Sequence, residues 1–188
     1  LRPAIERRRA RRCHGDLHLG NIALWQGEPA PFDAIDFNDA FSDIDPLFDL
    51  AFLLMDLDHR GHAELGPPVL NAWIEAVAAD PGGDLDTACA GLALLPLYKA
   101  VRATIRAKVG ALALQATANA NADARDAPAA DQRLAEARAY LSLAHDYLAL
   151  PPSLRVVAVG GFSGTGKTTV ARAIAARTGA CLLYTSPS

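Results

Sequence analysis

The sequence predicts an α+β fold: a mostly helical unit that contains one small strand pair, followed by the first strand, glycine-rich loop and helix of an α/β unit. Three observations predict it. Two short apolar runs with turn residues between them lie before residue 38, helical patterns then continue to residue 150, and a β-branched run enters a glycine-rich loop after residue 155. Pro151-Pro152-Ser153 separates the two units, because proline interrupts both helices and central strands.

Local signals define the elements of the first unit. The residues up to Arg12 look like the end of a basic helix, and strands are expected at Ile22–Trp25 and Phe32–Phe37, around a turn that includes Gln26-Gly27-Glu28-Pro29. Asp45 and Pro46 provide the cap and the first position of a helix whose body, Leu47–Leu57, is apolar on nearly every side and is therefore expected at the centre of the core. Further helices are expected at Pro68–Ala79, at Leu85–Ala118 with a break at Pro96, and at Asp131–Leu150, with an alanine-rich connection at Asn119–Ala130.

The composition excludes several classes of protein. Of the 188 residues, 51% are hydrophobic and 21% are charged, which is the balance of a soluble protein with a core. The net charge of −3 argues against a general nucleic-acid binder, and no apolar run reaches the ~18 residues of a membrane span. No hydrophobic signal segment opens the sequence. Cys13, Cys89 and Cys181 are isolated and lack metal-ligand spacing, so a reducing cytoplasm is the expected location.

Charge is distributed unevenly along the chain. Between Cys13 and His59 there is no lysine or arginine, but there are ten acidic residues. Composition alone favours a solvated acidic loop, whereas a divalent metal, a cationic substrate or helix N-termini could also compensate the carboxylates. The acidic residues are Asp16, Glu28, Asp33, Asp36, Asp39, Asp43, Asp45, Asp49, Asp56 and Asp58.

A polar loop, His14-Gly15-Asp16-Leu17-His18-Leu19-Gly20-Asn21, precedes the first expected strand, and Asp36 lies near the end of the second. Asp16 and Asn21 are five residues apart, so a carboxylate and an amide of one loop can face one cleft. Phosphoryl transfer from ATP needs a base near the attacking hydroxyl and oxygen ligands that hold Mg²⁺ against the phosphates. Asp16, Asn21 and Asp36 could supply these groups, because Mg²⁺ takes oxygen ligands and usually only one or two carboxylates.

This loop resembles the catalytic loop of the aminoglycoside phosphotransferase and choline kinase families, which are relatives of the protein kinases. The resemblance implies that Asp16 is the catalytic base and that Asn21 and Asp36 are metal ligands. It further implies that Asp49 is a buried aspartate tying the loop to the central helix, and that His14 is structural. The first unit would then be the helical C-terminal lobe of a protein-kinase-like fold, and the smaller N-terminal lobe of that family cannot fit before Cys13.

Other polar and aromatic residues have simpler interpretations. His18 is expected to line the loop or a pocket rather than to be a ligand, and Asp33, Asp39 and Asp43 are expected to be caps or solvated acids that could meet a cationic substrate. Trp73 and Tyr98 fit a core or a pocket wall. Lys99, Arg102 and Arg106, with Lys108 beside them, share one helical face; they could hold an anionic substrate, but a solvated or ion-paired face is favoured.

A second motif begins at Arg155-Val156-Val157-Ala158-Val159-Gly160, whose β-branched residues predict a buried parallel strand. The segment that follows has the P-loop (Walker A) pattern G-x-x-x-x-G-K-[ST], and a helical pattern comes after it. Its backbone N–H groups and the positive end of the helix would bind phosphates of ATP, with Lys167 reaching the β- and γ-phosphates and Thr168 binding Mg²⁺. The predicted ATP-binding residues are Gly161, Ser163, Gly164, Thr165, Gly166, Lys167, Thr168 and Thr169.

Together the two motifs resemble a bacterial two-domain family described as bifunctional aminoglycoside phosphotransferase/ATP-binding proteins. The expected organisation is a kinase-like lobe at residues 1–150, a linker at 151–153, a truncated P-loop domain at 154–180 and a non-native tail at 181–188, both ends of the sequence looking cut. The resemblance implies an ATP- and Mg²⁺-dependent phosphotransferase with a small-molecule hydroxyl acceptor, while the charge and the short apolar runs argue against a nucleic-acid or membrane partner. Two alternatives stay open: a nucleotide-binding regulatory protein whose kinase-like lobe is silent, and a folded helical lobe without a ligand.

Overall fold

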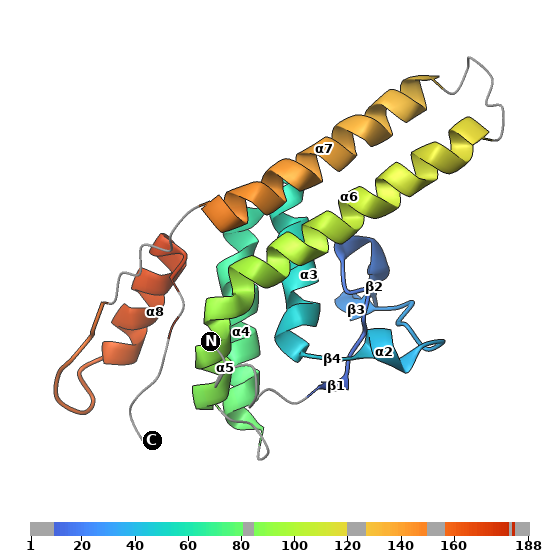
Figure 1. Cartoon of the computed structure of the whole chain (residues 1–188). Helices are drawn as coiled ribbons and strands as arrows, with labels where there is room; N and C mark the ends of the chain where they lie inside the picture. The colour runs from blue at the N-terminus through green and yellow to red at the C-terminus, as the bar shows by residue number, and fades with distance from the viewer. Residues whose placement is uncertain (1–9, 81–84, 120–126, 150–156, 181, 183–188) are drawn as a thin grey trace.

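The computed structural model describes residues 10–80, 85–119, 127–149, 157–180 and 182. The central helix is α3 (Pro46–His59), which lies beside the long antiparallel helices α6 (Leu95–Asn119) and α7 (Ala127–Ala149). In Figure 1 the small strands lie on one side of α3, whereas α4 (Gly66–Ala79) and α8 (Lys167–Thr178) lie on the other. The described part is therefore mostly helical with two small sheets, as a kinase-like helical lobe requires.

The basic segment at the start pairs as a strand. The expected helix end at Arg12 is wrong, because β1 (Arg11–Arg12) pairs antiparallel with β4 (Asp43–Ile44). The backbone N–H of Cys13 continues the pairing by donating to the carbonyl of Ser42 at 2.7 Å. Arg12 also forms an ion pair with Asp39 on the short helix α2 (Asp39–Ser42).

The hairpin that follows has a tighter turn than expected. β2 (Ile22–Trp25) is confirmed, but its partner β3 is Glu28–Pro31 rather than 32–37. The turn consists of Gln26 and Gly27 alone, with φ values of +53° and +87°, and two left-handed residues are typical of the type I′ turn that joins twisted strands. Asp33, at φ +61°, leaves the extended conformation and prevents the following apolar residues from continuing the strand.

The central helix α3 forms as expected. Asp45 caps it, its carboxylate accepting the N–H of Leu47 at 2.9 Å, and Pro46 occupies its first position. Its apolar residues contribute to two clusters, one against α6 and α7 and one against α4. The fully buried large side chains include Phe52, Leu47 and Met55, all on this helix, so the core is built around it.

The remaining helices also follow the predicted pattern closely. The break expected near Pro96 is found as the short 3-10 segment η3 (Leu92–Leu94) between α5 (Leu85–Gly91) and α6, and Pro96 occupies the second position of α6, where a missing N–H costs little. A second 3-10 segment, η2 (Ala63–Leu65), precedes α4. Most of the connection expected at 119–130, namely residues 120–126, lies outside the described residues, and α7 begins four positions earlier than predicted.

The helix pair α6–α7 packs closely because its facing residues are small. Ala100, Ala103 and Ala107 of α6 are buried in one cluster with Ala144 and Tyr140 of α7.

By length and composition alone the stretch Ala88–Thr117 could cross a membrane, with a mean hydropathy of 1.3 in its most apolar window. A third of that window is buried inside the structure, and a core helix passes the same test.

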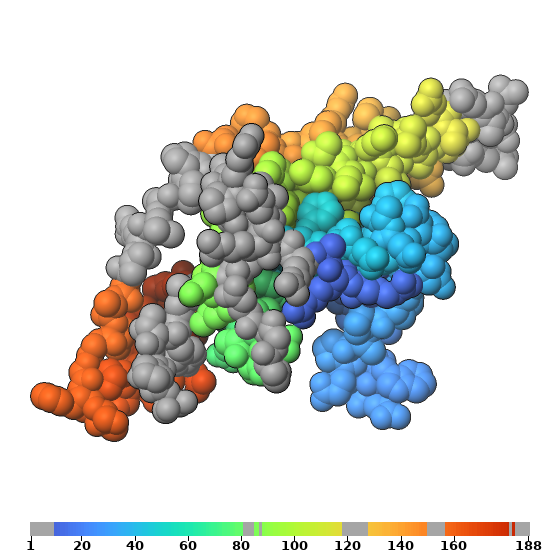
Figure 2. Space-filling model, turned by 60° about the horizontal axis from the view of Figure 1, so that its bottom comes forward, coloured from blue at the N-terminus to red at the C-terminus, as the bar shows by residue number. Residues whose placement is uncertain are grey.

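The C-terminal unit is formed in part. The helix α8 begins at Lys167 as the P-loop pattern predicts, but residues 157–160 are not in a strand. The physical reason is that a parallel strand needs neighbouring strands, and both sheets of the described residues lie in the first unit. The linker at 151–153 lies outside the described residues. In Figure 2 the β2–β3 hairpin and the segment 157–180 protrude at opposite sides of the molecule.

Candidate functional site

The second residue of the loop from His14 to Asn21 occupies a position that only glycine fits well. Gly15 has a φ of +82°, and a Cβ at this position would lie 2.8 Å from the carbonyl oxygen of Phe41. The neighbouring segment is held against the same turn, since the N–H of Ile35 donates to the carbonyl of His14 at 2.9 Å. The backbone of the His-Gly-Asp sequence is therefore restricted, and this restricts the direction in which the side chain of Asp16 points.

Asp49 holds the start of this loop. Its carboxylate accepts the backbone N–H of His14 at 2.9 Å and of Gly15 at 3.1 Å, and the residue is only 5% exposed. These bonds agree with the structural role that the resemblance implies for Asp49. A buried carboxylate needs such partners, because desolvation without hydrogen bonds costs several kcal/mol.

Arg102 compensates the charge of Asp49 from a distant helix. Its Nη1 donates to the carbonyl of Gly15 and its Nε to that of Phe48, each at 3.1 Å, while Nη2 lies 3.6 Å from Asp49 Oδ1. The guanidinium lies 4.0 Å from the ring centre of Phe48 and 4.9 Å from that of Phe52. Burial lowers the pKa of Arg102, and the nearby carboxylates of Asp49 and Asp16 oppose that shift.

Of the two forms expected for the cationic face of α6, solvated or ion-paired, Arg102 takes the ion-paired one: it is 6% exposed and faces Asp49. Lys99 forms an ion pair with Asp58, whose carboxylate also accepts the hydroxyl of Tyr147. Arg106 lies over the ring of Tyr140, and Lys108 is exposed. The sequence indicated the face of the helix correctly but could not show that α3 and the loop cover its middle.

A second buried carboxylate, Asp56, was missed in the sequence. It accepts the N–H of Leu19 at 3.0 Å, and the same oxygen accepts Nε of Arg60 at 3.0 Å. Asp49 and Asp56 are seven residues apart, so they lie on one side of α3 two turns apart. That spacing within an otherwise apolar helix was the signal that could have identified Asp56.

Three polar side chains meet in the middle of the loop. Asn21 donates from Nδ2 to the backbone carbonyl of Asp16 at 3.0 Å and to its carboxylate Oδ2 at 3.1 Å. His18 places Nε2 at 3.5 Å from the same oxygen and accepts the N–H of Gly20 on Nδ1 at 3.0 Å. The side chain of Asp16 is 42% exposed, so a solute can reach it. His18 thus lines the loop, as expected.

The predicted Mg²⁺ ligands Asn21 and Asp36 lie on adjoining segments. Asp36 is exposed and follows Ile35, which is bonded to the loop. Among the described residues both side-chain hydrogen bonds of Asn21 leave from Nδ2, so its amide oxygen is available. This all-oxygen donor set fits Mg²⁺. Within the described ranges no group of three His, Cys, Asp or Glu is arranged as a metal site, so protein carboxylates alone do not form one.

The residues just before Asp16 have structural contacts. His14 donates from Nε2 to the carbonyl of Phe32 at 2.8 Å, which agrees with its expected structural role. Cys13 lies half-buried beside this loop, with Sγ 3.6 Å from the carbonyl of Ile44. Burial, and then the negative charges of Asp49 and Asp45, raise the pKa of the Cys13 thiol to about 11.

The other candidates from the sequence take structural positions. Asp33 is exposed in its left-handed turn, and Asp43 is exposed on β4. Tyr98 donates its hydroxyl to Asp45 at 2.9 Å, and Trp73 packs against the cluster around Leu47. These aromatic residues belong to the core, as expected.

The P-loop residues form an exposed turn before α8. Gly164 and Gly166 adopt φ values of +79° and +77°, and the first turn of α8 has no side-chain cap among the described residues. Lys167 and the Thr165 hydroxyl both donate to the carbonyl of Phe162, at 2.5 and 2.8 Å. The predicted residues Gly161, Ser163, Thr168 and Thr169 are also exposed here. The loop therefore leaves backbone N–H groups open at a helix N-terminus.

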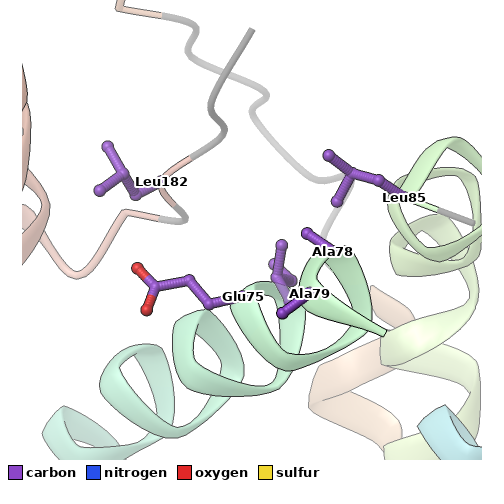
Figure 3. Close-up of a pocket in the computed structure, with 6 residues that line it drawn as sticks. Glu75, Ala78, Ala79, Leu85 and Leu182 are labelled. Atoms are coloured by element: carbon purple, nitrogen blue, oxygen red, sulfur yellow. The ribbon is translucent and has the colours of Figure 1, made fainter. Parts of the chain in front are cut away.

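A shallow cavity of about 250 Å³ lies away from both motifs. In Figure 3 Leu182 and Leu85 stand on either side of the last turns of α4. The lining of this cavity is nearly all apolar and includes no residue of the loop around Asp16. The cavity is therefore not the candidate active site. The lining residues are Ile74, Glu75, Ala78, Ala79, Leu85 and Leu182.

Comparison with known proteins relates the N-terminal part of the chain to phosphotransferases. Residues 1–86 match the sequence profile of the phosphotransferase enzyme family. Uncharacterized proteins of Mycobacterium tuberculosis (strains H37Rv and CDC 1551) and of Mycobacterium bovis are 36% identical over 172 residues, which is 92% of this chain. The chain spans about 30% of the length of these relatives. No solved structure gives a significant match. Residues 1–86 are thus similar to phosphotransferases, of the aminoglycoside phosphotransferase-like kind.

Proposed function

We propose that this chain carries the catalytic loop of an ATP- and Mg²⁺-dependent phosphotransferase that transfers the γ-phosphoryl group to a hydroxyl of a small molecule. The observation that carries the proposal is the loop itself, in which an accessible carboxylate is oriented by Asn21 and held through two buried carboxylates. Phosphoryl transfer requires mainly such positioning, because the reaction needs little covalent participation by the protein.

In the proposed mechanism Asp16 accepts the proton of the acceptor hydroxyl. Asn21, through its amide oxygen, and Asp36 would hold Mg²⁺, which neutralises phosphate charge when it is bound. Asp49, Asp56 and Arg102 keep the loop backbone in place while Asp16 remains reachable. The proposed location is the cytoplasm, where ATP and reduced cysteines are available.

The glycine-rich turn at Gly161–Thr169 supports a second proposal, a nucleotide site at the N-terminus of α8. Open backbone N–H groups at a helix N-terminus favour phosphate, and Lys167 is placed to leave its contact with Phe162 for a phosphate. If only this site is active, the kinase-like unit is a regulatory module, which is the alternative function.

The decisive experiment measures ADP release, with Mg²⁺-ATP and a panel of aminoglycosides, choline and small sugars, in the polypeptide at its full native length. Asp16→Asn should lower acceptor-dependent ADP release by roughly 10²- to 10⁴-fold, because it removes a general base. Lys167→Ala is the matched control and should leave that reaction in place. Loss of ADP release in Lys167→Ala but not in Asp16→Asn would instead establish the regulatory alternative.

A further inference from the structure

The two carboxylate oxygens of Asp16 have different surroundings. Oδ2 accepts a hydrogen bond from Nδ2 of Asn21 at 3.1 Å and faces Nε2 of His18 at 3.5 Å. Among the described residues nothing donates to Oδ1. One oxygen is therefore held by the loop, and the other is left for a solute.

The tautomer of the neutral His18 ring follows from the hydrogen bond at its other nitrogen. Nδ1 accepts the backbone N–H of Gly20 at 3.0 Å, so the neutral ring carries its hydrogen on Nε2, the nitrogen that faces Asp16. The same contact makes His18 the cap of the 3-10 turn η1 (Leu19–Asn21), which delivers Asn21 to Asp16. The ring is 5.2 Å from that of Phe52, and its side chain is only 13% exposed, so its orientation is restricted.

We propose that His18 is a positioning residue that, together with Asn21, occupies Oδ2 of Asp16 and thereby assigns Oδ1 as the oxygen that receives the proton of the acceptor hydroxyl. This inference rests on the proposed phosphotransferase function. The distance of 3.5 Å is longer than a hydrogen bond, and contacts of this kind often shorten when substrate binds. His18 does not touch the reacting atoms; it acts through Asp16.

Two substitutions separate the two contacts of the ring. His18→Gln places an amide nitrogen near the position of Nε2 and removes the acceptor at Nδ1, whereas His18→Asn places an amide oxygen near Nδ1 and removes the donor at Nε2. With ADP release as the assay, His18→Asn should lower kcat roughly 10-fold or more with little change in the KM for ATP, since it removes the N–H donor that faces the charged oxygen of Asp16 and that would shorten its contact when substrate binds. His18→Gln should retain most of kcat. His145→Asn, at an exposed histidine of α7, is the control.

A measurement that needs no activity accompanies the kinetics. The ¹⁵N NMR shifts of the His18 ring at neutral pH should show the hydrogen on Nε2, and the Gly20 amide should exchange with solvent faster in His18→Gln than in His18→Asn. A hydrogen on Nδ1, or a His18→Asn enzyme as active as the unchanged protein, overturns the inference. If no acceptor gives ADP release while the Nε2 tautomer is found, the proposed function fails and the arrangement of His18 on Oδ2 is upheld.

Discussion

Two carboxylates on α3, at Asp49 and Asp56, accept backbone N–H groups from the two ends of one loop. Each also faces an arginine, Arg102 in one case and Arg60 in the other. Charge within a helical core is tolerated here because every carboxylate has several donors. The loop backbone is thus held by charge-assisted bonds, and the side chain of Asp16 stays partly exposed to solutes.

Asp49→Asn should lower the free energy of unfolding by ~3–5 kcal/mol, because it leaves the buried guanidinium of Arg102 without its counter-charge. Urea denaturation followed by circular dichroism measures this difference. Asp39→Asn is the control: its ion pair with Arg12 is exposed, and such pairs contribute ~0–1 kcal/mol. Equal losses of unfolding free energy in Asp49→Asn and Asp39→Asn would contradict the idea that burial strengthens the Asp49–Arg102 interaction.

Cys13 gives a pH-dependent prediction. Its pKa is raised to about 11 from 9.0, so above pH 9 the unfolded chain releases this proton while the folded chain keeps it. The contribution of Cys13 to stability is therefore present below pH 9 and is lost as the pH rises toward 11. Between pH 8 and pH 10.5 the unchanged protein should lose more unfolding free energy than Cys13→Ser, which has no thiol to titrate. Parallel pH profiles would contradict the burial of this thiol.

At the scale of elements, the sharp turns of the first unit depend on two glycines with similar φ and different surroundings. Gly15→Ala would drive a Cβ to 2.8 Å from the carbonyl of Phe41, whereas Gly27→Ala meets nothing within 4 Å. Gly27→Ala should cost about 1–2 kcal/mol, the penalty for a left-handed residue, and Gly15→Ala should cost clearly more. Thermal unfolding of both variants tests this, and equal costs would remove the close approach from the explanation.

The elements that the sequence could predict are those with local signals. Asp45 and Pro46 mark the start of α3, and Pro96 marks the break before α6, because capping and a missing N–H act within a few residues. The second strand was misplaced because Phe32–Phe37 is mostly apolar, while the two-residue turn makes the paired strand begin four positions earlier, at Glu28. In the site, Asp16 and Asn21 could be paired from their spacing. Arg102 could not be connected with Gly15, since only tertiary packing brings them together.

For the whole molecule, the two motifs lie on different units. Figure 1 shows α8 beyond α4, on the side of α3 opposite the β2–β3 hairpin, and the N–H of Leu182 and the carbonyl of Ala180 bond to Asn71 on α4. Changes at the two motifs should therefore act independently, as is usual for distant sites.

Mg²⁺-ATP at about a hundred times its Kd should stabilise each occupied site by ~2.7 kcal/mol. Asp36→Asn should reduce the stabilisation that comes from nucleotide at the Asp16 loop. Lys167→Ala should remove the stabilisation that comes from nucleotide at the glycine-rich turn. In the double variant the loss of stabilisation should equal the sum of the two single losses. Thermal shift with increasing Mg²⁺-ATP measures all three. A single variant that abolishes the whole shift would mean one nucleotide site or a tight coupling between two.

The bond between Arg102 and Gly15 joins residues 87 positions apart in the chain. During synthesis the whole segment that matches the phosphotransferase profile leaves the ribosome before Arg102 does, because the match ends at residue 86. Until α6 follows, the carbonyl of Gly15 and the carboxylate of Asp49 have no guanidinium to meet, and long-range contacts of this kind close late in folding. A fragment cut at the boundary of the family match would thus contain every motif residue of the loop and still lack the cation that holds it.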